Sequence, residues 1–209
     1  MADSGGSQRG GGSGSRRNRN SSGGAAGAVL LALIGVVVVA SRGADPPGPG
    51  LSAAKAAARK GHYDAAWQAL SLTGGKAATD RTTQCAANSF GQVRDAFLGT
   101  PCQSLRRTLL AVRDTRANTA FVSIAWVSMA NAAGARALKV IADRDGSGDI
   151  RPIGGDVLSE QHVRFTGAYY ASRRSGPLLV IAEAAPVRGH PSATLLHQAA
   201  EVGAEFPAP

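Results

Sequence analysis

The polar and apolar pattern of the chain begins with a polar low-complexity segment and a long apolar run. Residues 1–22 are mostly Gly, Ser, Arg and Asn, which predicts a disordered tail because almost nothing in them can be buried. The run Gly23–Ala40 contains no charge, and as a helix it would span roughly 27 Å, enough to cross a bilayer. The pattern therefore predicts a transmembrane helix over residues 23–41.

The charges that flank the apolar run predict its orientation. Arg16, Arg17 and Arg19 precede it, and a single Arg42 follows it closely. Because basic flanks stay in the cytoplasm, we expect a single-pass protein of the cell membrane with a cytoplasmic N terminus and an extracytoplasmic C-terminal domain. Cleavage as a signal peptide before Ser41 is the alternative. The apolar run is long for a signal peptide, and no cysteine follows it for lipid attachment.

The next segments predict a spacer and a helical region. Residues 42–50 contain three prolines and are expected to form a short extended stalk. Between Leu51 and Leu72 apolar residues recur every three or four positions, which is typical of helices, and Gly61 should divide them. Residues 73–83 are polar and contain glycine, so they predict a loop. Residues 51–84 would thus be a helical segment followed by a loop.

From residue 85 to residue 209 the pattern alternates between the helical period and the strand period. The expected elements are a helix with Phe90, Val93, Phe97 and Leu98 on one face, strands at 105–114 and 119–129, a helix at 131–142, strands at 162–174 and 177–187, and a helix from 192. The strand at 119–129 is apolar on both faces, so it should be central, with Trp126 in the core. The order predicts an α+β fold with a four-stranded antiparallel sheet, helices on one face, and the ββα unit twice.

Two cysteines, Cys85 and Cys102, lie beyond the predicted span. Outside the cytoplasm an even pair predicts a disulfide, which would contribute about 3 kcal/mol through loop-closure entropy. Two buried thiols are the alternative.

Three phrases carry a resemblance to a known group of proteins: CAANSFGQVRDAFLGTPC, TLLAVRDTRANTAFVSIAWVSM and VRFTGAYYASRRSGPLLVIAEAAPV. Over residues 85–209 the chain resembles an uncharacterised group of actinobacterial membrane-anchored proteins. The group has no assigned activity. The resemblance therefore implies a lineage and an anchored architecture, and it assigns no role to any residue.

The segment from Asp143 to Ile150, DRDGSGDI, matches the first eight positions of a calcium-binding EF-hand loop. The candidate metal ligands are Asp143, Asp145, Ser147 and Asp149. Gly154 stands at the twelfth position, where such loops have a bidentate carboxylate, so a helix cap followed by a glycine-rich turn is the alternative. We therefore expect no cofactor, and calcium is the possibility that this loop raises.

A second candidate site is an aromatic and basic cluster made of Tyr169, Tyr170, Arg173 and Arg174. Strand alternation pairs Tyr169 with Arg173 on one face and Tyr170 with Arg174 on the other. Arginine beside aromatic rings suits anionic or sugar ligands. An edge strand with packed tyrosines and solvated arginines is the alternative.

The charge of the chain and its motifs together limit the classes of function that the sequence allows. The chain has 23 basic and 14 acidic residues, a net charge of +9, which favours anionic lipid or wall polymers as partners if the charge is patchy. No aromatic-basic nucleic-acid motif and no catalytic motif occurs. We therefore expect a non-catalytic binding or interaction module of the cell envelope, with lipid, wall polymer or an envelope protein as partner. The alternatives are an envelope hydrolase or metal-dependent enzyme, using the aspartates of 143–149 or His197 with Glu201, and a structural subunit of a membrane complex.

Overall fold

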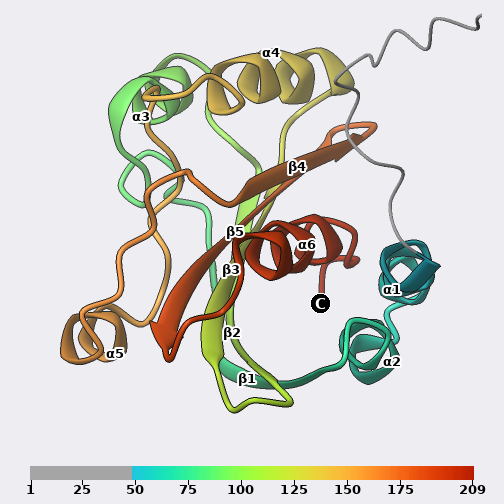
Figure 1. Cartoon of the computed structure of the whole chain (residues 1–209). Coiled ribbons are helices and arrows are strands. Elements are labelled where there is room, and N and C mark those ends of the chain that lie inside the picture. The colour runs from blue at the N-terminus through green and yellow to red at the C-terminus, as the bar shows by residue number, and fades with distance from the viewer. Residues whose placement is uncertain (1–48) are drawn as a thin grey trace, which may run out of the picture. The chain divides into compact units, whose positions relative to one another are not determined.

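Residues 49–209, the part of the chain that the computed structural model describes, form six helices and a five-stranded sheet (Figure 1). In chain order the elements are α1 (Pro49–Arg59), α2 (Tyr63–Gln68), β1 (Leu72–Thr82), α3 (Gly91–Gly99), β2 (Ser104–Asp114), β3 (Thr119–Ser128), α4 (Ala132–Ala142), α5 (Gly155–Glu160), β4 (Tyr170–Ser175), β5 (Leu178–Arg188) and α6 (Ala193–Gly203). The predicted tail and span lie outside the described residues. Within residues 49–209 no helix has the length and apolar character needed to cross a membrane.

The sheet is antiparallel throughout, in the order β1-β2-β3-β5-β4. The prediction of four strands is wrong by one, because residues 73–82 of the segment expected to be a loop belong to β1. This strand pairs only with β2, from Leu72 opposite Asp114 to Thr82 opposite Leu105. The side chains of an edge strand can be polar and solvent-exposed, so such a strand need not show the alternation of apolar and polar residues. Residues 72–82 form a strand because they pair with β2.

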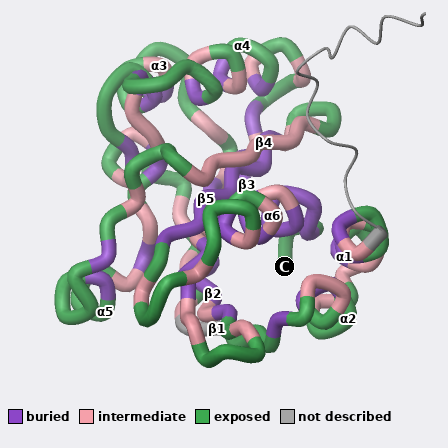
Figure 2. Tube along the Cα trace, viewed as in Figure 1, coloured by how far each residue is buried: buried purple, intermediate pink, exposed green. Residues whose placement is uncertain are grey.

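Helices cover both faces of the sheet, which corrects the prediction that they lie on one. The side chains of Val122, Ile124 and Trp126 in β3 pack in a core with α1, α2 and α6. Ala125 and Val127, which point the other way, pack with α3 and α4, and Phe121 packs with α5. The buried segments in Figure 2 accordingly include β3 and parts of the helices around it. The two ββα units thus place their helices, α4 and α6, on opposite faces.

Several local predictions are confirmed. The side chain of Asn131 caps α4 by accepting from the Gly134 N–H at 2.9 Å, and Ser192 caps α6 by accepting from the Leu195 N–H at 3.2 Å. A two-residue turn joins β4 to β5, with Ser175 paired to Leu178. However, the strand expected at 162–174 is formed only from Tyr170 onward.

The disulfide between Cys85 and Cys102 is present, with the two Cα atoms 6.2 Å apart. It brackets α3, whose residues Val93 and Phe97 are buried. Leu98, expected on the same buried face, is instead 62% exposed.

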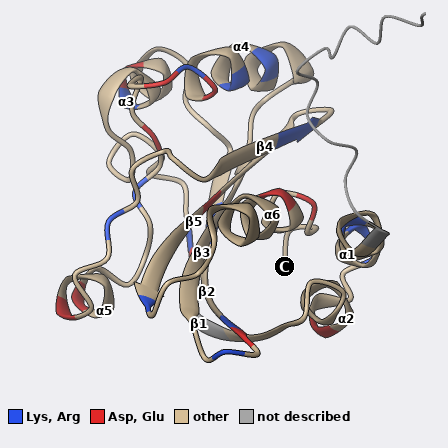
Figure 3. Ribbon diagram, viewed as in Figure 1, with Lys and Arg blue, Asp and Glu red and all other residues tan. Residues whose placement is uncertain are grey.

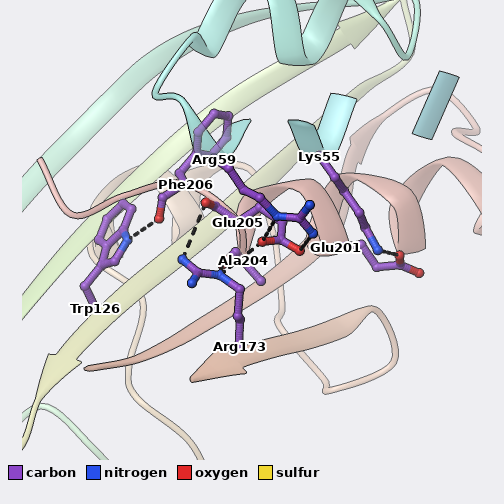
Figure 4. Close-up of polar contacts among 8 residues, drawn as sticks. All are labelled: Lys55, Arg59, Trp126, Arg173, Glu201, Ala204, Glu205 and Phe206. Atoms are coloured by element: carbon purple, nitrogen blue, oxygen red, sulfur yellow. Dashed lines mark hydrogen bonds and ion pairs between the residues drawn. The ribbon is translucent and has the colours of Figure 1, made fainter. Parts of the chain in front are cut away.

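The residues after α6 form a C-terminal clasp, Ala204–Phe206, that joins α1, β3 and β4 (Figure 4). The Trp126 indole N–H donates to the Phe206 carbonyl at 2.8 Å. Arg59 donates twice to the Glu205 carboxylate, at 2.8 and 2.9 Å, and the guanidinium of Arg173 lies 3.1 Å from the same carboxylate. Glu205 is thereby held between two cations.

The ring of Phe206 is fully buried at the centre of this clasp. It stacks on Tyr63 with ring centroids 4.2 Å apart, and it lies 5.4 Å from the ring of Trp67. Because α2 carries both of these rings, the end of the chain holds the first helices against the sheet.

Substitution of two adjacent glycines, Gly74 and Gly75, would test the packing of β1 on α2. A Cβ atom on Gly74 would lie 2.5 Å from the buried Trp67 ring, whereas one on Gly75 would meet nothing within 4 Å. We expect Gly74→Ala to lower the free energy of unfolding by about 1–3 kcal/mol, since overpacking moves a buried ring. Gly75→Ala should leave it unchanged or slightly higher. Thermal melting of both full-length variants in detergent checks this, and equal melting temperatures would contradict it.

Candidate functional site

A pocket of about 320 Å³ lies on the sheet face that carries α3 and α4. It combines acidic side chains with aromatic rings, and we call it the acidic–aromatic pocket. Its four carboxylates and three aromatic rings are those of Asp143, Asp145, Asp149, Glu183, Phe90, Phe165 and Tyr170. Figure 3 shows the acidic positions of the loop after α4 beside α3.

The wall of the pocket is the loop at 143–151, which is fixed by backbone hydrogen bonds to the segment before α3. The Phe90 N–H donates to the Asp149 carbonyl at 3.0 Å, and the Arg151 N–H donates to the Asn88 carbonyl at 2.8 Å. Beneath the loop, Arg107 of β2 donates to the Arg151 carbonyl at 2.9 Å. The loop is therefore attached to the sheet as well as to its neighbour.

The two segments cross so closely that glycine is required at the crossing. A Cβ atom on Gly148 would lie 2.2 Å from the Phe90 carbonyl oxygen, and one on Gly91 would lie 2.5 Å from the Ser147 carbonyl oxygen. Both glycines have φ in the left-handed region, at +92° and +61° respectively. The position of Asp149 is thus set by backbone contact.

The floor of the pocket is Glu183, a carboxylate in the middle of β5 that is only 7% exposed. It pairs across the sheet with Tyr170 of β4, and its carboxylate accepts from the Gly167 N–H. Burial raises the pKa of Glu183, while the backbone N–H groups of Gly167 and Thr166 oppose that rise. The sequence analysis missed this residue, although a lone acid within the apolar strand PLLVIAEAAPV was a usable signal.

Asp149 lies beside Glu183 with a strongly altered acidity. Burial raises the pKa of Asp149 to about 7, against the opposing hydrogen bond from the Ile150 N–H at 2.6 Å, and the charge of Glu183 contributes to the rise. The pocket therefore holds one carboxyl group that exchanges a proton near neutral pH.

Asp143 is fully engaged by its neighbours. Its carboxylate accepts from Lys139, from the Ser172 hydroxyl, and from the Tyr170 hydroxyl at 3.1 Å. Burial acts to raise the pKa of Asp143, but the hydrogen bonds from Lys139 and Ser172 outweigh it and lower that pKa. Burial raises the pKa of Tyr170, as do the charges of Asp149 and Asp143, so the phenol keeps its proton.

The structure brings three of the four candidate metal ligands to the pocket. Asp143, Asp145 and Asp149 line it, but Ser147 is buried outside the lining, with its hydroxyl donating to the Gly148 carbonyl at 3.3 Å. The described residues contain no group of three or more His, Cys, Asp or Glu side chains placed to hold a metal ion. Calcium binding by this loop stays an untested possibility.

The candidate cluster on β4 divides across the sheet, with the alternation that the sequence predicts. Tyr170 joins the acidic–aromatic pocket, whereas Tyr169 faces α6 with its ring 5.0 Å from that of His197. Arg173 belongs to the C-terminal clasp, and Arg174 donates to the Gly176 carbonyl at 3.0 Å. The predicted metal ligands and the predicted aromatic and basic cluster thus contribute to one pocket, to which the cluster supplies Tyr170.

The pair His197 and Glu201 is not arranged as a shared site. His197 packs against Tyr169, while the carboxylate of Glu201 forms an ion pair with Lys55 of α1. Both residues serve the packing of α6.

The raised pKa of Asp149 predicts a pH-dependent effect of Asp149→Asn on stability. Between about pH 4 and pH 7 the folded state keeps this proton while the unfolded chain releases it. The carboxyl group therefore lowers the stability of the fold by an amount that grows over this range and levels off above about pH 7. The full shift corresponds to at most about 4 kcal/mol. We expect the variant to melt at least about 3 °C above the wild type near pH 8 and level with it near pH 4.

The measurement is thermal melting of the full-length protein across this pH range. Asp145→Asn, which removes an exposed carboxylate from the same loop, is the matched control for the loss of one negative charge. A difference between Asp149→Asn and wild type that is constant with pH would show that the pKa of Asp149 is not raised in the folded state.

Comparison with known proteins finds no matching family model, no matching curated protein and no matching solved structure. The resemblance to actinobacterial membrane-anchored proteins therefore stays a prediction, and the case for a function depends on the pocket.

Proposed function

We propose that this protein is a membrane-anchored binding module of the cell envelope and that the acidic–aromatic pocket is its ligand site. The observation that carries the proposal is the burial of Glu183 in the floor of an open pocket. A carboxylate within a sheet is unfavourable unless it is paired, so a carboxylate kept there indicates a functional site. The volume is at the lower end of the range for small-molecule sites.

The experiment compares two tryptophan substitutions of equal bulk. Thr166 lines the pocket, whereas Ala168, two residues further on, is exposed and lies outside the lining. Isothermal titration of the full-length protein in detergent would use amines, N-acetylglucosamine and inorganic phosphate as probes. We expect at least one probe to bind the wild type and Ala168→Trp, and Thr166→Trp to weaken that binding at least tenfold. Binding that Thr166→Trp leaves unchanged, or no binding of any probe, would reject the pocket as the site.

The envelope location rests on the predicted span and its flanking arginines. Protease added to intact cells should therefore digest residues 49–209 and spare a tag placed at residue 1. Digestion of the tag with the domain intact would reverse the topology.

A second candidate function, an envelope hydrolase, is favoured by the pair Asp149 and Glu183. General acid–base catalysis uses carboxyl groups with pKa values near the working pH, and burial raises the pKa of Asp149 to about 7. Turnover of 4-nitrophenyl glycosides or esters by the full-length protein, lost in Asp149→Asn and kept in Glu160→Gln, a change on the exposed surface of α5 outside the pocket, would establish this function. The absence of turnover by the wild type on the whole panel leaves the binding module as the proposal.

A further inference from the structure

The acidic–aromatic pocket has the opposite sign of charge to the chain as a whole. The chain carries a net charge of +9, yet four carboxylates and a single cationic side chain, Arg144, line this pocket. Arg144 donates to the Gln92 side chain at 3.3 Å, and no ion pair joins it to a carboxylate in the described part of the chain. Acidic side chains therefore outnumber cationic ones in the lining of the pocket by four to one.

Three of the four pocket carboxylates lack a cationic partner among the described residues, and two of these, Asp149 and Glu183, are shielded from water. Asp143 is paired with Lys139, but no ion pair within residues 49–209 involves Asp149 or Glu183. Their hydrogen-bond partners are backbone N–H groups. A largely buried carboxyl group must keep its proton or gain a positive charge nearby to offset its lost hydration, and no described residue supplies that charge to this pair.

The aromatic rings supply a second, independent feature that favours a cation. Phe90, Phe165 and Tyr170 line the same cavity, and the faces of aromatic rings attract cations. Phe90 already does so within the protein, because the guanidinium carbon of Arg151 lies 5.5 Å from its ring centroid. The C-terminal end of α4, which carries partial negative charge, also lines the cavity through Ala142 and Asp143.

The size of the cavity separates an organic cation from a metal ion. A volume of about 320 Å³ is far larger than a bare ion requires, and the carboxylates are not gathered into a group that could hold a metal within the described residues. A small organic molecule would fill the space between the rings while its charged end reaches Asp149 and Glu183. An ammonium group suits these two carboxylates, because it offers three N–H donors.

We propose that the acidic–aromatic pocket binds a small organic cation that carries a primary ammonium group. The inference rests on the proposed function and names the class of its ligand. In this arrangement the ammonium lies between Asp149 and Glu183, and the apolar part of the ligand contacts the rings of Phe90 and Phe165.

The test compares amines with neutral molecules of the same shape. The probes are benzylamine and 1,4-diaminobutane, each matched with its alcohol, together with benzoate as the anion. They would be titrated at about pH 8 into the full-length protein in detergent. We expect at least one amine to bind at least tenfold more tightly than its alcohol and benzoate not to bind. An alcohol that binds as tightly as its amine would overturn the inference, and so would the absence of binding by both amines.

Glu183→Gln isolates the charge, because the amide keeps the size of the side chain and an oxygen that can accept from Gly167. We expect it to weaken amine binding at least tenfold and to remove the preference over the alcohol. The control Glu160→Gln, on the exposed surface of α5, should leave both unchanged. Unchanged binding to a Glu183→Gln variant that melts as a folded protein would overturn the inference. If N-acetylglucosamine or phosphate binds in a manner that Thr166→Trp blocks while amines do not, the proposed function stands and the ligand class is wrong. If no probe binds, both fail.

Discussion

Phe206→Ala is expected to lower the free energy of unfolding by about 3–5 kcal/mol, which is the range for removing a fully buried aromatic ring. The ring is inaccessible to solvent and stacks on Tyr63 and against Trp67. Its removal leaves a cavity between α2 and the sheet that these rings cannot close, because α1 and β1 hold α2 in place. We expect the melting temperature to fall by roughly 10 °C.

The control for this prediction is Leu98→Ala, a truncation of a side chain that is 62% exposed. It should shift the melting temperature of the full-length protein by no more than about 2 °C. If Phe206→Ala melts within a few degrees of the wild type, the clasp is not packed on α2 as described. The Trp126 hydrogen bond should survive the change, because its acceptor is the carbonyl of residue 206.

Loss of the disulfide is the second large effect that we expect. The double variant Cys85→Ser/Cys102→Ser should lose about 3 kcal/mol of stability, because the bond closes a loop with a sequence separation of 17. The corresponding fall in melting temperature is about 10 °C. Melting with and without a reductant measures it.

Reductant supplies the internal control for the disulfide. It should lower the melting temperature of the wild type by a similar amount and leave the double variant unchanged. A wild type that reacts with a thiol-alkylating reagent before reduction has free cysteines, and this result would contradict the bond. A decrease under reductant in the double variant would assign the effect to something other than Cys85 and Cys102.

The elements that could be predicted from sequence are those whose signals are local. Asn131 and Ser192 begin helices because a short polar side chain can accept from an N–H three residues on, and this pattern is visible in the sequence alone. The β4–β5 turn is local in the same sense. The strand β1 could not be predicted this way, because its glycines and polar residues resemble a loop and only β2 makes it a strand.

The placement of helices on both faces of the sheet is also a tertiary property. The sequence showed that β3 is apolar on both faces, which already requires cover on each side. It did not show which helix takes which face, because α4 and α6 both present an apolar stripe. The choice depends on chain connections that no local pattern records.

The candidate site also combines features that are visible in the sequence with features that depend on tertiary contacts. Asp149 and Tyr170 were predicted as members of two separate sites, and only the crossing of the loop over the sheet unites them. Arg173 was predicted as a ligand-binding residue, but the structure uses it to hold Glu205. Glu183 belongs to no recognisable motif in the sequence, because a single acid in an apolar strand does not show whether its side chain faces water or the interior, and only the structure shows that it is buried.

The C-terminal clasp also has a consequence for the order of events in folding. Arg59 and Glu205 are separated by 146 residues, so their contact closes one of the longest loops in the domain. Loop closure over such distances is slow, and a ribosome makes residue 206 long after residues 63 and 67. Until then, the apolar rings of α2 have no partner from the chain's end. The nascent segment therefore exposes Trp67 during synthesis, and in this period a chaperone would be able to bind the exposed side chain.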